Sequence, residues 1–144
     1  MYETTINEIL NTDKITRKIY LGCYAIDELT KINKFPSCLI INSEPRTKSG
    51  EHWLACYFDS NKNVYFFDSY GKEPSFYKLD KFLKNNSLKI FYNTKRIQGI
   101  LPYCGLYCIF FLIFIVRNRL FDFYKPFKKN VILNDNFIHQ NISQ

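Results

Sequence analysis

The chain has 144 residues, of which 47% are hydrophobic and 18% aromatic, and this composition fits one folded domain and excludes an intrinsically disordered chain. Its net charge of +7 permits a nucleic-acid partner without requiring one, because 15 Lys against 5 Arg are also typical of an AT-rich coding sequence. Five Cys without a C-x-x-C pair, and a polar start without a secretory signal, indicate reduced thiols inside a cell.

The first part of the chain shows patterns of short helices. Apolar spacing predicts helices over residues 3–10 and 25–32, with a turn opened by Gly22 between them. Phe35-Pro36 then interrupts the chain, because the residue before a proline disfavours helical backbone.

Apolar runs between polar segments predict strands in the middle of the chain. The polar residues 59–63 are few enough to join two of these runs as a hairpin. The expected strands are residues 38–42, 52–58, 64–67 and 88–92.

Two longer helices are expected, from Pro74 to about residue 85 and from about Gly105 to Arg119. The second contains an apolar run of 11 residues, 106–116, which is shorter than the roughly 20 that cross a bilayer. We therefore expect an α+β fold in which a mostly antiparallel sheet packs against this buried helix. The expected domain is residues 1–144, with a core of about 20–120 and an irregular end over 121–144.

Cys104 directly precedes the apolar run and would lie at the N-terminus of the buried helix. The helix dipole and free N–H groups at that end stabilise a thiolate, the nucleophilic form of cysteine. Gly105 follows and lets a substrate backbone come close. A cysteine in an apolar setting is also a common inert core residue, so its position alone leaves both interpretations open.

His52 and Asp68 stand at the two ends of the predicted hairpin that lie together. An Asp beside a His fixes the tautomer and orientation of its ring. Gln98 stands six residues before Cys104, where both could donate N–H groups to an oxyanion. Each residue alone has an ordinary structural explanation, but the combination indicates an active site with a cysteine nucleophile.

These segments resemble the adenovirus-type cysteine proteases and the related SUMO- and ubiquitin-like-protein proteases. The similarity extends from Gly22 to about Phe114 and is carried by GEHWLA at 50–55, FFDSYG at 66–71, QG at 98–99 and CGLYC at 104–108. The SUMO proteases have Asp as the acidic member of the triad and a spacing of six residues from the oxyanion Gln to the catalytic Cys, as here. The adenovirus enzymes have Glu and a spacing one residue longer.

The resemblance implies a cysteine endopeptidase. Cys104 would attack the scissile carbonyl as a thiolate, His52 would protonate the leaving amine, and Asp68 would hold the His52 ring. Gln98 and the backbone N–H of Cys104 would stabilise the oxyanion.

The resemblance also implies substrate-binding residues. In the SUMO proteases a Trp after the catalytic His, and a second aromatic residue three positions before an Asp, enclose a Gly-Gly substrate end. Trp53 occupies the first of these positions, and Tyr24 with Asp27 matches the second, so we expect cleavage after small residues, preferably Gly, with Gly105 beside the substrate. Plain core packing is the alternative for both rings.

The chemistry requires no cofactor, and we expect no metal site, although Cys104 and Cys108 are spaced to share a helix face with a His nearby. The adenovirus protease is stimulated by DNA and by a viral peptide tethered through a Cys. Residues 86–90, the comparable segment, contain no Cys, which argues against such a tether. Activation by DNA or by a peptide stays open.

The preferred hypothesis is a maturation protease of a DNA virus or of a virus-related Polinton/Maverick-like element. Its partners would be capsid or core precursors, with non-specific DNA binding permitted and no membrane contact, in the host nucleus, at the assembly site or in the virion. The alternatives are a protease of ubiquitin-like conjugates, an acetyltransferase with the same triad, and a non-catalytic interaction domain.

Overall fold

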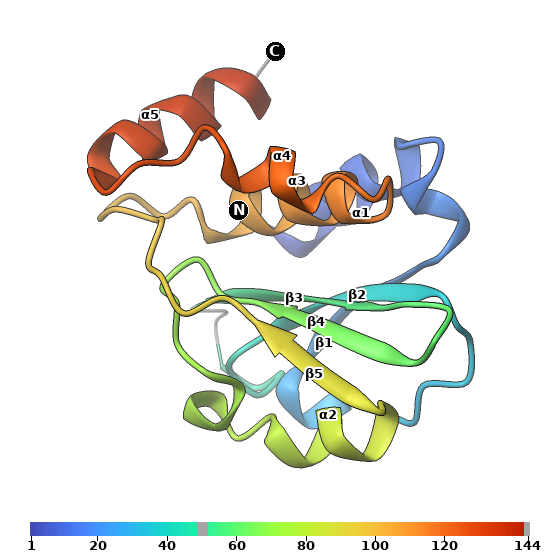
Figure 1. Cartoon of the computed structure of the whole chain (residues 1–144). Coiled ribbons are helices and arrows are strands. Elements are labelled where there is room, and N and C mark those ends of the chain that lie inside the picture. Colours follow the sequence, from blue (N-terminus) through green and yellow to red (C-terminus); the bar gives the residue numbers. More distant parts are fainter. Residues whose placement is uncertain (49–51, 143–144) are drawn as a thin grey trace.

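A computed structural model of the chain describes residues 1–48 and 52–142, in which five strands form one sheet with helices on both faces (Figure 1). The strands follow the order of the sequence across the sheet and are β1 (Tyr20–Ala25), β2 (Ser37–Asn42), β3 (Trp53–Phe58), β4 (Asn63–Phe67) and β5 (Lys89–Tyr92). The helices are α1 (Glu3–Thr12), α2 (Asp80–Asn86), α3 (Cys104–Ile115), α4 (Leu120–Tyr124) and α5 (Val131–Ile142). Of the five α-helices, α2 is the one on the lower face of the sheet in Figure 1. These elements confirm the expected α+β class.

The sheet is mixed, so the expectation of a mostly antiparallel sheet is not confirmed. β3 pairs antiparallel with β2 and with β4, whereas the outer pairs β1–β2 and β4–β5 are parallel. Parallel neighbours need a crossover connection, and residues 26–36 and 68–88 provide these connections. The apolar pattern of a strand carries no information about the direction of its neighbour, which is why the pattern alone could not predict this topology.

The helix expected over residues 25–32 is wrong, because β1 runs to Ala25 and only a 3-10 turn, Ile26–Glu28, follows it. Gly22 lies inside β1 and not in a turn. Its φ of +129° is a backbone conformation that favours glycine, and it coincides with an irregularity of register between Tyr20 and Cys23. Because this bulge interrupts the alternation of side chains along β1, a simple apolar pattern did not predict the strand.

A helix was expected to run without interruption from Pro74, but the structure divides this segment. A 3-10 turn covers Pro74–Tyr77, Lys78 takes a left-handed conformation with φ of +61°, and α2 begins two residues later. The break matters for the site, because it leaves Tyr77 beside the end of β4.

The centre of the sheet is buried on both faces. In β2, Cys38 and Ile40 pack into the core cluster beneath α3, whereas Leu39 and Ile41 pack into the cluster that faces α2. A strand buried on both faces has a continuous apolar sequence, which is the pattern that predicted this strand.

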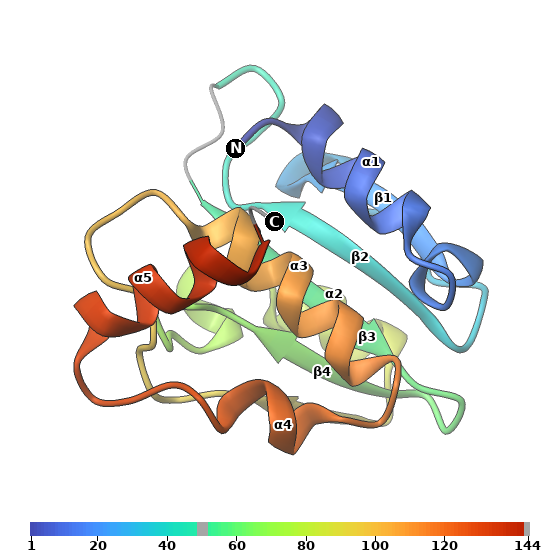
Figure 2. The same ribbon diagram turned by 90° about the horizontal axis from the view of Figure 1, so that it is seen from above.

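Helix α3 is apolar on nearly all sides and lies across the sheet between α1 and α4 (Figure 2). It begins at Cys104, and its buried residues pack against those of β3 and β4. It ends at Ile115, before the expected end at Arg119, and Asn118 follows with φ of +58°. No helix in residues 1–48 and 52–142 is long and apolar enough to cross a membrane.

The irregular C-terminal region expected from the sequence is also wrong, because α4 and α5 occupy most of it. Asn134, Asp135 and Ile138 of α5 are at most 1% exposed. Asn and Asp are poor helix formers, so burial and hydrogen bonds to the rest of the molecule, and not local propensity, stabilise this helix.

Candidate active site

The sheet and α3 bring His52, Asp68 and Cys104 to one end of the β3–β4 hairpin. His52 immediately precedes β3, and Asp68 immediately follows β4. Ala55 pairs with Phe67 in the antiparallel register, so the two polar residues meet at the same end of the hairpin. Cys104 is the first residue of α3, which packs over β3. The Gly50-Glu51 segment before His52 lies outside the described residues.

His52 and Asp68 form a buried pair. Nε2 of His52 lies 2.6 Å from Oδ1 of Asp68, and the two residues are 8% and 0% exposed. Burial by itself would lower the pKa of His52, but hydrogen bonds with Asp68 and Cys104 outweigh it and raise this pKa to about 9. The imidazole is therefore held in its charged form at neutral pH.

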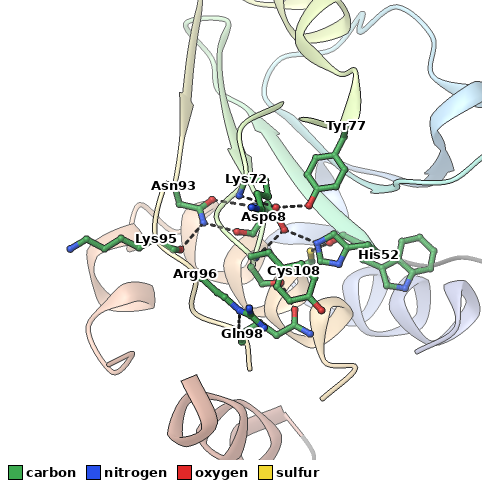
Figure 3. A network of polar contacts seen from close by, with 12 residues as sticks. His52, Asp68, Lys72, Tyr77, Asn93, Lys95, Arg96, Gln98 and Cys108 are labelled. Atoms are coloured by element: carbon green, nitrogen blue, oxygen red, sulfur yellow. Dashed lines mark hydrogen bonds and ion pairs between the residues drawn. The ribbon is translucent and has the colours of Figure 1, made fainter. Parts of the chain in front are cut away.

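The carboxylate of Asp68 accepts further hydrogen bonds that hold it in place. Figure 3 shows the side chains of His52 and Tyr77 converging on it. Oδ2 accepts from the hydroxyl of Tyr77 at 2.6 Å and from the backbone N–H of Lys72 at 3.0 Å, and Oδ1 accepts from the N–H of Tyr70 at 3.0 Å. Burial would raise the pKa of Asp68, but these donors and His52 lower it overall.

The side chain of Asn93 holds the backbone of Asp68 on the other side. Its Oδ1 accepts from the Asp68 N–H at 3.1 Å, and its Nδ2 donates to the Asp68 carbonyl at 2.6 Å (Figure 3). Sequence reasoning missed Tyr77 and Asn93. A tyrosine in a 3-10 turn and an asparagine after an edge strand carry no signal of this role, because each reaches Asp68 only through the tertiary fold.

The other ring nitrogen of His52 is directed to Cys104, since Nε2 is occupied by Asp68 and the imidazole also hydrogen-bonds the thiol. The ring stacks on Tyr70 with centroids 4.5 Å apart and an interplanar angle of 12°. This stacking fixes the plane of the imidazole between its two partners.

Cys104 differs electrostatically from the other cysteines. Burial would raise its pKa, but His52 and the backbone N–H groups of Trp53 and Gly105 stabilise the thiolate and lower the pKa below the ordinary value. Burial raises the pKa of every other cysteine, which are Cys23, Cys38, Cys56 and Cys108. Cys104 is thus the one of the five free cysteines of the chain whose pKa is lowered.

Gln98 is fully buried, and the orientation of its amide is fixed at both ends. Oε1 accepts a hydrogen bond from the hydroxyl of Ser69, and Nε2 donates to the carbonyl of Leu101 at 2.7 Å. Among the described residues, the second N–H of Nε2 has no hydrogen-bond partner. The role of Ser69 was not predicted, although its position directly after Asp68 placed it near the site.

Trp53 and Gly105 lie against each other beside Cys104. A Cβ atom added to Gly105 would come within 3.3 Å of the Trp53 ring and of Met1. The indole N–H of Trp53 donates to the carbonyl of Met1 at 3.2 Å. Trp53 also lines an open pocket with Ala25 and Asn42.

Tyr24 does not form the expected pair with Trp53. It packs in the cluster on the α2 face of the sheet and donates to the carbonyl of Leu21 at 3.1 Å, whereas Trp53 packs on the α3 face. Of the β1 side chains, Tyr20 and Cys23, on either side of the register irregularity, pack in the cluster on the α3 face. Asp27 is exposed and accepts from the backbone N–H of Arg46 at 3.0 Å.

Several basic side chains of the C-terminal region lie outside this site. His139, Lys125, Lys128 and Lys129 are all exposed. In residues 1–48 and 52–142, no group of three or more His, Cys, Asp or Glu side chains is arranged to hold a metal ion.

Known proteins match the part of the chain that contains these residues. A family model described as adenovirus endoprotease matches residues 20–142, from β1 to α5. The chain belongs to the adenovirus endoprotease family. The resemblance of its motifs to the adenovirus-type cysteine proteases is thereby confirmed.

Two relatives with similar sequences are viral proteins. The protease of Bovine adenovirus 2 is 33% identical over 90 residues, which are 53% of this chain and 44% of that protein. A protein of Acanthamoeba polyphaga mimivirus, whose name designates a thiol protease, is 31% identical over 93 residues, 58% of this chain and 31% of that protein. The chain thus spans about half or less of the length of the curated relatives that it matches.

Among solved structures, the ASFV protease is similar with a TM-score of 0.52 and 17% sequence identity. The alignment covers 82% of this chain and 58% of that chain. This likeness shows a shared fold.

Proposed function

We propose that this chain is a cysteine endopeptidase with Cys104 as nucleophile, His52 as proton donor and acceptor, and Asp68 as the residue that orients His52. One observation carries the proposal: Cys104 is the cysteine whose pKa is lowered, and its partner imidazole is held by a buried carboxylate. Membership of a family of adenovirus endoproteases supports it.

The reaction starts from the Cys104 thiolate and the protonated His52. The sulfur attacks the scissile carbonyl carbon, and the electron pair of the C=O bond moves to oxygen. The backbone N–H of Cys104 and the free N–H of Gln98 are the proposed donors to this oxyanion. The C–N bond then breaks as His52 gives its proton to the leaving amine, and an acyl-enzyme forms.

Water completes the cycle. His52, now neutral, takes a proton from the water as the oxygen attacks the thioester carbonyl, and the second tetrahedral intermediate releases the carboxyl product and the Cys104 thiolate. Each step uses only groups of the protein, namely the thiolate, the imidazole, the carboxylate and the N–H donors. We therefore propose no cofactor for the chemistry itself.

We further propose cleavage after small residues, preferably Gly. The support is the close approach of Trp53 to Gly105 beside the nucleophile, which limits the space for a side chain next to the scissile bond. The proposed substrates are viral capsid or core precursors, since the relatives that match are viral proteases. The proposed places of action are the host nucleus, the assembly site and the virion.

A protease of ubiquitin-like conjugates is the second candidate. Two features favour this second candidate because they match the SUMO proteases. They are the Asp at position 68 and the spacing of six residues from Gln98 to Cys104. DNA binding stays a proposal as well, supported by the exposed Lys95, Lys128 and Lys129 that line one groove.

The test is cleavage of a complex peptide library by the reduced protein, with new ends mapped by mass spectrometry and a Cys104→Ala variant as control. Cuts after Gly that are absent from the variant would support the endopeptidase. A folded ubiquitin-like protein with a C-terminal electrophile is assayed in parallel, and labelling of Cys104 by that probe alone would favour the second candidate.

The same assays are repeated with added DNA and with short viral peptides, which tests stimulation by either. Cleavage that continues at the wild-type rate in Cys104→Ala would refute the proposed nucleophile. Failure of every probe under all of these conditions would refute the endopeptidase function.

A further inference from the structure

Helix α5 contacts the segment that leads to the nucleophile, residues 97–103, which we call the oxyanion loop. Asn134 donates from Nδ2 to the carbonyl of Ile97 at 3.0 Å, at the start of the loop. At its end, the rings of Tyr103 and His139 stack with centroids 5.5 Å apart. Figures 1 and 2 show α5 lying along this loop, at the Cys104 end of α3.

The central contact is made by the carboxylate of Asp135. Oδ1 accepts from the N–H of Gly99 at 2.9 Å and from the hydroxyl of Tyr107 at 2.7 Å, and Oδ2 accepts from the N–H of Leu101 at 3.3 Å. Asp135 is 1% exposed. A charged group this deeply buried is costly unless its hydrogen bonds are satisfied, and here three donors from two elements satisfy it.

Gly99 fits Asp135 closely. A Cβ atom at position 99 would lie 2.5 Å from Oδ2 of Asp135, so only glycine allows the loop backbone to approach the carboxylate. On the opposite side, Arg96 donates to the carbonyls of Gln98 and Gly99 at 2.7 and 2.9 Å. Asp135 therefore holds the N–H groups of Gly99 and Leu101, and Arg96 holds the carbonyls of Gln98 and Gly99.

These contacts reach the side chain of Gln98 through one intermediate residue. Asp135 holds the N–H of Leu101, and the carbonyl of the same residue accepts from Nε2 of Gln98. Ser69 fixes the other end of the amide. A displacement of the loop would therefore turn the remaining N–H of Gln98 away from its present direction.

We propose that Asp135 is the positioning residue of the oxyanion loop, which holds Gly99 and Leu101 so that the Gln98 amide is aimed at the oxyanion. The inference rests on the proposed peptidase function. It assigns to α5 a role in the reaction, although no residue of α5 touches the substrate or the nucleophile in this account.

The test replaces Asp135 by Asn, which keeps the size of the side chain but leaves one of its two terminal atoms unable to accept a hydrogen bond. We expect kcat on a short peptide substrate to fall about 10- to 100-fold with KM changed less than about twofold, because a misplaced donor weakens binding of the transition state only. The rate of Cys104 alkylation by iodoacetamide should stay the same, since alkylation has no oxyanion.

A second readout requires no turnover. Hydrogen exchange at the Gly99 amide, at the Leu101 amide or at both should become faster in Asp135→Asn, because Asn keeps one acceptor atom where the carboxylate has two. Asp122→Asn is the matched control, since Asp122 is a partly exposed carboxylate that pairs with Arg119 in α4. It should change neither kcat nor the exchange rates.

The proposal would be overturned if Asp135→Asn kept the wild-type kcat. It would also be overturned if both amides exchanged at the wild-type rate in this variant. A loss of alkylation equal to the loss of kcat would also overturn it, because the variant would then disturb the triad. If Asp135→Asn fails to fold, Tyr107→Phe removes one of the three donors to Asp135 and should lower kcat about two- to fivefold.

Wild-type kcat in Tyr107→Phe would then count against the proposal. If the wild-type protein shows no Cys104-dependent cleavage, the proposed function has failed, and the exchange rates alone decide whether Asp135 orders the loop.

Discussion

At the scale of single residues, the imidazole of His52 is charged because it lies between two acceptors. Asp68 holds one ring nitrogen and the Cys104 thiolate accepts from the ring as well. The contact between the two side chains raises the pKa of His52 and lowers that of Cys104. Each partner therefore favours the charged form of the other, and the pair is ionised over a range of pH in which free thiols and imidazoles are mostly neutral.

The first prediction concerns the reactivity of this thiol. In the wild type, alkylation of Cys104 should remain fast below pH 8.5, the usual pKa of cysteine. In His52→Ala, the imidazolium is lost while burial still raises the pKa of Cys104, so the rate near pH 7 should fall more than about tenfold. The measurement is the alkylation rate against pH, followed by mass spectrometry.

Lys125→Ala is the control, because it removes an exposed cationic side chain at the end of α4, and its rate should equal that of the wild type. Peptide hydrolysis should decline above about pH 9 as His52 loses the proton that it gives to the amine, whereas alkylation should not. An alkylation profile unchanged in His52→Ala would refute the ion pair.

At the scale of elements, α5 depends on the rest of the molecule for its stability. Its sequence has few strong helix formers, but Ile138 is fully buried in the same core cluster as Leu106 and Phe111 of α3. Burial of this face joins α5 to the main core. The helix is thus positioned firmly enough for Asp135 to act on the oxyanion loop.

The second prediction compares two isoleucines of α5. Ile138→Ala should lower the free energy of unfolding by about 2–4 kcal/mol, because it leaves a cavity in the core. Ile132 is 61% exposed, and Ile132→Ala should change the free energy of unfolding by less than about 0.5 kcal/mol. Urea unfolding of the two variants checks this, and equal effects would show that α5 does not belong to the core.

At the scale of the whole molecule, an ion pair joins the N-terminal segment to the far end of α3. Asp13 accepts from both terminal nitrogens of Arg117, at 2.7 and 3.0 Å, across 104 residues of sequence. Burial would raise the pKa of Asp13, but Arg117 and Thr16 outweigh it and lower this pKa to about 2. The contact holds α1 on the same face of the sheet as α3.

The third prediction is that Asp13→Asn lowers the free energy of unfolding near pH 7 by about 2 kcal/mol, from the difference between the folded and unfolded pKa. A depressed pKa stabilises the fold above about pH 4, and this contribution disappears as the pH falls toward 2. Urea unfolding at several pH values should show the two proteins converging in acid.

Asp122→Asn, which removes a more exposed pair with Arg119, should have an effect of less than about 0.5 kcal/mol at every pH. A difference between wild type and Asp13→Asn that persists at pH 2 would contradict the assignment.

Apolar periodicity within the sequence was enough to predict the strands of the hairpin and the buried helix. Short motifs and their resemblance to a known family pointed to His52, Asp68, Gln98 and Cys104, whose catalytic roles stay predictions. Only the packing of the whole chain sets the mixed directions of the sheet and the α2-facing position of Tyr24. The same holds for the contacts of Tyr77, Asn93 and Asp135 with the site. Asn93 meets Asp68 across 25 residues and Asp135 meets Gly99 across 36. Contacts at such separations arise from packing of whole elements, and no local pattern of residues encodes them.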